Sequence, residues 1–169
     1  MEPLSATGIF TVPPSLDVYQ TIIFAFFDEE REYFSLVEDV EEYEAELEEL
    51  ATTMQGFLDK EEVVINDERV RPRVVGVHVG FGEAPEDVYI SYFIHFKGNP
   101  RKGVNYYENI YQETVAEYPI SAYWFFHPGI EVIEVEASGD VEIVSGNIVA
   151  MHVVSGEMVN GYEKIVFRL

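Results

Sequence analysis

Basic side chains gather at one end of a predicted β-hairpin, in a chain that is otherwise strongly acidic. The strands of this hairpin are expected over residues 73–81 and 88–97, and six of the 10 basic residues flank its open end: Arg69, Arg71, Arg73, Lys97, Arg101 and Lys102. Guanidinium and ammonium groups bind phosphates and carboxylates through charge-assisted hydrogen bonds. The cluster therefore predicts a site for an anionic small molecule or for an acidic segment of a partner. The alternative is that these cations neutralise the chain's own acidic helix, or that of a second copy.

Aromatic side chains alternate with carboxylates between residues 104 and 124. Tyr107 and Tyr111 lie on one long predicted strand, and Tyr123 and Trp124 lie on the next. Aromatic walls with a few polar groups are typical of small-molecule clefts, and paired carboxylates beside aromatic rings are typical of glycoside hydrolases. The third interpretation is a sheet with one solvated face and one core face. The pattern makes these four residues a candidate aromatic cleft, and no catalytic residue is assigned.

Other reactive side chains show no spacing that indicates a reaction. The absence of cysteine excludes disulfides, thiolate nucleophiles and zinc–thiolate sites. In the expected register of the 73–97 hairpin, His95 faces Val74 and lies about 13 Å along the strands from His78. Two histidines that far apart cannot share a metal ion, whose ligand distances are about 2 Å. We therefore predict no metal site and no cofactor, and we favour a chain that is not an enzyme.

The charge balance restricts the partners of the chain. It carries 32 acidic and 10 basic residues in 169, for a net charge of −22. Nucleic acids and anionic membranes both attract Lys and Arg, so neither is an expected partner. The longest apolar run, 22–27, is too short to cross a bilayer, and the first residues lack the features of a signal peptide. These features predict a cytoplasmic protein.

One helix is expected, over about residues 39–58. Asp39 is the expected N-cap and Gly56 marks the last turn, while residues 31–37 before it look like a strand. Apolar residues recur at spacings of three and four, which makes one apolar stripe: Val40, Tyr43, Leu47, Leu50, Ala51, Met54, Phe57 and Leu58. The opposite faces are rich in Glu. They predict either a solvated surface or a surface that docks a basic protein partner or mimics a nucleic acid.

The rest of the chain has the period-two pattern of β-strands separated by short turns. About ten strands are expected, joined mostly as antiparallel neighbours. The predicted fold is α+β and β-dominated: an antiparallel sandwich or a strongly curved sheet, with the amphipathic helix packed on it. We expect residues 1–169 to form a single domain, made of an N-terminal strand or hairpin (8–37), the helix (39–58) and antiparallel strands (62–169).

Two functional hypotheses follow from these features. The favoured hypothesis is a non-catalytic binding or protein-interaction module that self-associates as a homodimer, through the basic hairpin end and exposed aromatic residues. The alternative is a protein that binds an anionic small molecule, or a hydrolase, with a cleft between the helix and the sheet.

Overall fold

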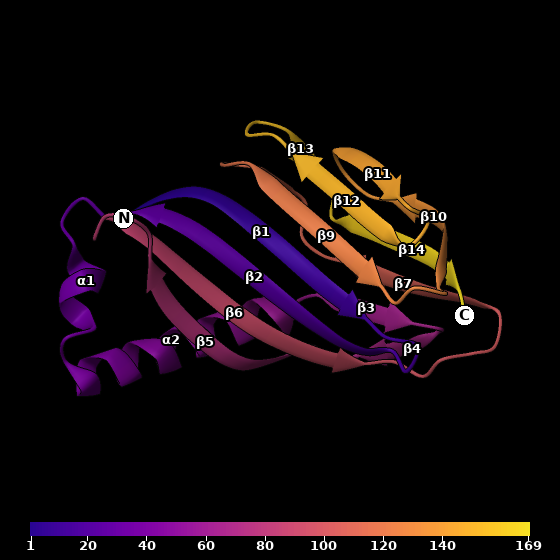
Figure 1. The fold of residues 1–169 in the computed structure, drawn as a ribbon, viewed down its shortest axis with the longest axis horizontal. Coiled ribbons are helices and arrows are strands. Elements are labelled where there is room, and N and C mark those ends of the chain that lie inside the picture. The colour runs from indigo at the N-terminus through magenta and orange to yellow at the C-terminus, as the bar shows by residue number, and fades with distance from the viewer.

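The computed structural model describes all of residues 1–169 and shows a β-dominated α+β chain, which confirms the predicted fold class at this level (Figure 1). Strands hold 54% of the residues and helices 14%. The structure has 14 strands and two helices, where about ten strands and one helix were predicted. The elements are β1 (Glu2–Val12), β2 (Asp17–Phe27), α1 (Glu32–Leu36), α2 (Val40–Leu58), β3 (Glu62–Ile65), β4 (Glu68–Val70), β5 (Arg73–Phe81), β6 (Asp87–Lys97), β7 (Val104–Ile110), β8 (Thr114–Val115), β9 (Ile120–Phe126), β10 (Glu131–Glu136), β11 (Asp140–Val144), β12 (Ile148–Val153), β13 (Met158–Val159) and β14 (Tyr162–Arg168).

The strands form two large sheets and one small sheet. The large sheets have the orders β11-β12-β9-β1-β2-β6-β5 and β10-β14-β7-β3-β4, and β13 pairs with β8 alone. All pairs are antiparallel except β1 with β9, which run parallel from Ala6 beside Ile120 to Val12 beside Phe126. The prediction of a wholly antiparallel fold is wrong at this one pair. A tight turn forces neighbouring strands to be antiparallel, but β9 reaches β1 after a long connection that allows either direction.

The two large sheets pack face to face through aromatic side chains. Trp124 of β9 stacks on Phe10 of β1, with ring centroids 3.8 Å apart. From the other sheet, the ring centroid of Tyr107 lies 4.5 Å from that of Trp124, and Phe167 lies 5.0 Å from Phe126. These contacts join strands that are remote in the sequence into one core of 22 buried residues.

The β5–β6 hairpin follows the predicted register over most of its length. From Gly76 to Phe81, paired residues have numbers that sum to 169, so His78 faces Ser91 as expected. The register shifts between Val74 and Gly76, and His95 therefore faces Arg73 instead of Val74. The single unpaired residue at this bulge also shifts the alternation, so Val74 faces Ile94 on the inner side and Val75 is 59% exposed.

The segment before the main helix is helical, and its predicted strand is wrong. Residues 32–36 form α1, and the hairpin partner of β2 is β1, so the N-terminal hairpin spans residues 2–27 in place of 8–37. The carboxylate of Asp28 is buried and accepts a hydrogen bond from the backbone N–H of Tyr33, at 2.9 Å. This local contact starts a helical turn in a sequence whose aromatic residues otherwise favour a strand.

Helix α2 begins where the sequence predicts and covers one edge of the seven-stranded sheet. The Asp39 side chain accepts hydrogen bonds from the N–H groups of Glu41 and Glu42, at 3.0 and 3.1 Å. The helix lies along β5 (Figure 1). Its Gln55 side chain accepts a bond from the N–H of Val74, at 2.9 Å. Of the apolar stripe, only Leu58 is fully buried.

The remaining stripe is buried less than predicted. Tyr43, Leu47, Leu50 and Met54 are half-buried against the core. The side chains at the two ends, Val40 and Phe57, are 67% and 57% exposed. Because the helix lies at an edge and not across the centre of the sheet, part of the inner sheet face stays uncovered beside it.

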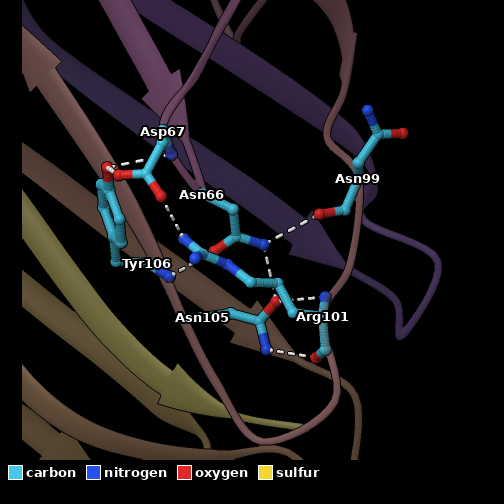
Figure 2. Close-up of polar contacts among 6 residues, drawn as sticks. All are labelled: Asn66, Asp67, Asn99, Arg101, Asn105 and Tyr106. Carbon is cyan, nitrogen blue, oxygen red and sulfur yellow. Dashed lines mark hydrogen bonds and ion pairs between the residues drawn. The ribbon is translucent and has the colours of Figure 1, made fainter.

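A polar network ties the β3–β4 turn to the loop that precedes β7 (Figure 2). Asn105 is completely buried. Its side-chain oxygen accepts bonds from the Asn66 side chain (2.7 Å) and the N–H of Arg101 (2.8 Å). Its side-chain nitrogen donates to the carbonyls of Arg101 and Gly103, at 2.8 and 2.9 Å. All of the hydrogen-bonding capacity of this buried amide is therefore used within the chain.

We expect the substitution Asn105→Ala to lower the free energy of unfolding by about 2–4 kcal/mol, because it leaves several buried polar groups without partners. Urea unfolding measures this loss. The matched control is Asn99→Ala, because the Asn99 side chain donates only to exposed Glu68. The control is expected to cost no more than about 0.5 kcal/mol. Equal losses in the two variants would contradict the assigned role of Asn105.

Candidate functional site

A cavity of about 650 Å³ lies where the inner sheet face is left uncovered. Its walls come from β1, β2 and β6 of one sheet, from β3, β7 and β14 of the other, and from the end of α2. Phenylalanines and aliphatic side chains make up most of the wall: Phe10, Ile22, Phe24, Phe26, Met54, Phe57, Leu58, Val63, Pro72 and Phe96. The cavity is thus an apolar space that the core does not fill.

Polar side chains gather at one end of this cavity. Strand β7 places Tyr107 and Asn109 on the same face, because side chains two residues apart point the same way. Asn109 pairs with Glu163 of β14 on one side, and with Val63 of β3 on the other. The turn between α2 and β3 adds Glu61. Two carboxylates, an amide and a phenol are therefore brought together from three segments of the chain.

These groups form hydrogen bonds that leave one buried acceptor unused. The Asn109 side-chain nitrogen donates to Glu61, at 3.0 Å, and the Tyr107 hydroxyl donates to Glu163, at 3.1 Å. Asn109 is only 7% exposed. Its side-chain oxygen has no hydrogen-bond partner in the chain. A buried amide oxygen without a partner is rare in folded proteins and calls for an explanation.

The environment of the two carboxylates favours their protonated forms. Burial is the main cause that raises the pKa of Glu163 to about 7; the charge of Glu61 contributes to this rise, and the Tyr107 hydrogen bond opposes it. Glu163 is half-buried and lines the cavity. Burial also raises the pKa of Glu61. No Lys, Arg or His lines the cavity, so no cation of the chain neutralises this pair from inside it.

The structure separates the four residues of the predicted aromatic cleft. Tyr107 and Tyr111 line the cavity. Burial beside Glu163 and Glu61 raises the pKa of the Tyr111 hydroxyl. Trp124 lies deeper, packed between Phe10 and Tyr107 in the core. Tyr123 is the next residue along β9 and points to the opposite, outer face of the sheet, where it is 38% exposed.

The predicted basic cluster is separated as well. Arg69, Arg71 and Arg73 line a second cleft, of about 290 Å³, beside the cavity. None of the three arginines forms an ion pair in the chain, with α2 or with any other element. The same cleft also contains Asp59 and Glu61, whose charges oppose a bound anion. Anion binding by these arginines stays a prediction.

The other three cations of that cluster lie outside this cleft. Arg101 pairs with Asp67 at 3.0 Å in the network around Asn105 (Figure 2). Lys97 is exposed at the end of β6, and Lys102 is exposed in the loop before β7. Arg101 therefore has a structural partner, and neither lysine lines the cavity.

Sequence reasoning missed Glu61, Asn109 and Glu163, although two of them carried a signal. In the last strand, Glu163 occupies the same face as Ile165 and Phe167, which are buried core residues. A carboxylate in a row of core residues needs a partner or a function. Asn109 likewise continues the buried row that contains Tyr107. Glu61 follows the helix in a turn and has no comparable pattern.

Two further observations concern metals and membranes. No group of three or more His, Cys, Asp or Glu side chains is arranged to hold a metal ion. Neither helix combines the length and the apolar character needed to cross a membrane.

Comparisons with known proteins do not assign a family. No protein-family model matches the chain, and no curated protein matches it. Among solved structures, it is similar to an aminopeptidase N family protein from Idiomarina loihiensis, with a TM-score of 0.34 and 6% identity over 95% of this chain and 29% of that chain. It is also similar to a candidate protease from Parabacteroides distasonis, with a TM-score of 0.31 and 8% identity over 99% of this chain and 40% of that chain. The chain spans less than half of either protein, and likeness at this level supports no conclusion on function.

The raised pKa of Glu163 predicts a stability that falls as the pH rises. The folded chain holds this proton up to pH about 7, whereas an unfolded glutamate releases it near 4.5. The stabilisation is therefore complete below about pH 4.5 and is lost as the pH rises to about 7. Relative to Glu163→Gln, we expect the wild-type free energy of unfolding to fall across this window, with a slope of up to about 1.4 kcal/mol per pH unit.

Urea unfolding at a series of pH values measures this difference. Glu62→Gln is the control for removal of a charge, because Glu62 is exposed on β3. A wild-type curve that stays parallel to the Glu163→Gln curve across the window would show that Glu163 holds no extra proton in the folded chain.

Proposed function

We propose that this protein binds a small molecule with an apolar body, held in the cavity between the two sheets and the end of α2. The observation that carries this proposal is the cavity itself, about 650 Å³ of space with apolar walls and a polar end. Natural ligand sites have volumes of about 300–1,000 Å³ and the same combination of apolar walls with a few polar groups. Binding of this kind requires no chemical step, in keeping with a non-catalytic module.

Charge separates this proposal from the binding of an anionic ligand. Glu61 and Glu163 line the cavity and no cation does. An anion placed there would meet two carboxylates and lose its hydration without gaining an opposite charge. An anionic ligand remains a hypothesis only for the separate cleft of Arg69, Arg71 and Arg73.

Filling the cavity should abolish binding of an apolar probe. Ile22 of β2 lines the cavity, and Ile23 points to the outer face of the same sheet. We expect wild type and Ile23→Trp to bind the neutral dye Nile red and 1-octanol, whereas Ile22→Trp loses at least about tenfold in affinity because the indole occupies the ligand volume. Dye fluorescence and titration calorimetry measure these affinities. Equal binding by the two variants would place the probe outside the cavity.

A second candidate function, self-association, is favoured by the outer face of the seven-stranded sheet. Apart from strand ends, the outward positions of β12, β9, β1, β2, β6 and β5 carry no Asp or Glu. Several large apolar side chains are 38–59% exposed on this face: Tyr19, Val75, Tyr89, Phe93, Tyr123 and Phe125. Extended apolar patches of this kind are typical of interaction sites.

A second copy of the chain is the partner that this face suits best. Two molecules of net charge −22 repel each other least where they approach through these six strands, which carry outward carboxylates only at their ends and exclude Asp140 and Glu142 of β11. A two-fold interface would bring the same face together from both copies, with few charged groups to be removed from water. Head-to-tail pairing of the acidic helix with the basic cluster is the competing geometry. Salt would weaken that pairing by screening attraction, and it would strengthen the face-to-face dimer by screening repulsion.

We expect sedimentation measurements to show a dimer of the 19.3 kDa chain that becomes tighter with added salt. Phe93→Glu should produce a monomer, because it places a carboxylate within the proposed interface. Ile133→Glu is the control, since Ile133 is similarly exposed but lies on β10 of the other sheet. A wild-type chain that stays monomeric at high concentration and high salt would rule out this candidate.

A further inference from the structure

The polar end of the cavity offers hydrogen-bond acceptors in excess of donors. Glu61 accepts from Asn109 and Glu163 accepts from Tyr107, although an ionised carboxylate has room for about four bonds. The buried oxygen of Asn109 accepts none. The Tyr107 hydroxyl and one amide hydrogen of Asn109 are already directed to the carboxylates. The other donors here, the Tyr111 hydroxyl and the second Asn109 hydrogen, are fewer than the acceptor positions that remain. The site as built therefore lacks a group that donates several hydrogen bonds and accepts none.

We propose that the ligand carries a protonated amine, seated between Glu61, Glu163 and the free oxygen of Asn109, with its apolar part along the phenylalanine wall. This inference rests on the proposed function and specifies its ligand class. A primary ammonium group has three N–H donors and no acceptor. These three donors match the two carboxylates and the one unpartnered amide oxygen that the chain provides.

The charge of the site agrees with this ligand and disfavours the other common head groups. A buried cation needs an opposite charge and filled hydrogen bonds to offset its lost hydration, and two carboxylates provide both. A hydroxyl head donates one bond and adds an acceptor where acceptors are already in excess. A carboxylate head would add a third negative charge. Among ligands that share one apolar chain and differ in the head group, the ligand with the amine is therefore expected to bind most tightly.

The shape of the cavity directs the rest of the ligand. Glu163 and Asn109 lie on strands of the five-stranded sheet, while Ile22, Phe24 and Phe26 lie on β2 across the cavity. A ligand with its amine at the carboxylates thus extends its apolar part toward the inner face of the seven-stranded sheet. Phe57 of α2 lines the cavity and is largely exposed, which places an apolar side chain at its rim.

The test compares three ligands of one chain length: octylamine, 1-octanol and octanoate. At about pH 8, where Glu163 is ionised, we expect octylamine to bind about 10- to 100-fold more tightly than octanol, as charge-assisted bonds allow. Octanoate is expected not to bind. In Glu163→Gln and in Glu61→Gln, the preference for octylamine should shrink to a few-fold while octanol affinity is retained. Glu108→Gln is the matched control, since Glu108 points away from the cavity and binds the Tyr162 hydroxyl.

Proton release gives a second readout that needs no variant. Near pH 6.5, between the ordinary glutamate value and the raised pKa of about 7, part of the Glu163 population is protonated. Binding of an ammonium group should displace that proton. Calorimetry of octylamine binding in buffers of different ionisation enthalpy should therefore show proton release. Octanol binding should show none. Octanol binding without any preference for octylamine or proton release would overturn the amine assignment and leave the proposed function intact. Failure of both ligands to bind would overturn both.

Discussion

The partial cover over the inner face of the seven-stranded sheet is the constraint on which the rest of the structure depends. Seven strands at about 4.8 Å spacing make a surface about 29 Å wide. The five-stranded sheet packs on it through Tyr107 and Phe167, and α2 packs beside β5 at the edge. Between them, the inner positions of β2 from Gln20 to Phe26 stay only half-buried, although those of β6 are buried. The cavity lies there, so its volume is a consequence of how the covering elements are arranged.

The cavity also explains why the polar cluster at its end can exist. Burying two carboxylates close together would be strongly unfavourable in a packed core, and the raised pKa values of Glu61 and Glu163 express that cost. Access to the cavity lets water or a ligand reach these groups. The Asn105 network offers a useful contrast, because its buried amide has all its partners in the chain. Asn109, four residues further along β7, lacks one partner, and this difference separates a structural amide from one that faces the cavity.

Period-two patterns predicted much of the fold because each strand displays its buried face in its own sequence. The buried row of β6 and the pairing of Gly76 to Phe81 with their partners were correct for this reason. The bulge at Val75, the parallel pairing of β1 with β9 and the helix of residues 32–36 were not predictable in this way. Each depends on a local hydrogen bond or on a contact between remote segments. The cavity belongs to the same class, since Glu61, Asn109 and Glu163 come together only through the order of β3, β7 and β14.

The same alternation explains why the predicted basic cluster lies beside the cavity and not in it. From β4 to the start of β5, the odd-numbered Arg69, Arg71 and Arg73 are exposed, while Pro72 is buried and lines the cavity. One short segment thus presents cations to the outer cleft and an apolar wall to the inner space. Leu58, Glu61 and Pro72 line both spaces, which are therefore neighbours with opposite charge. Segregation of this kind keeps the arginines from neutralising Glu163, and it leaves a cationic ligand as the natural source of the missing positive charge.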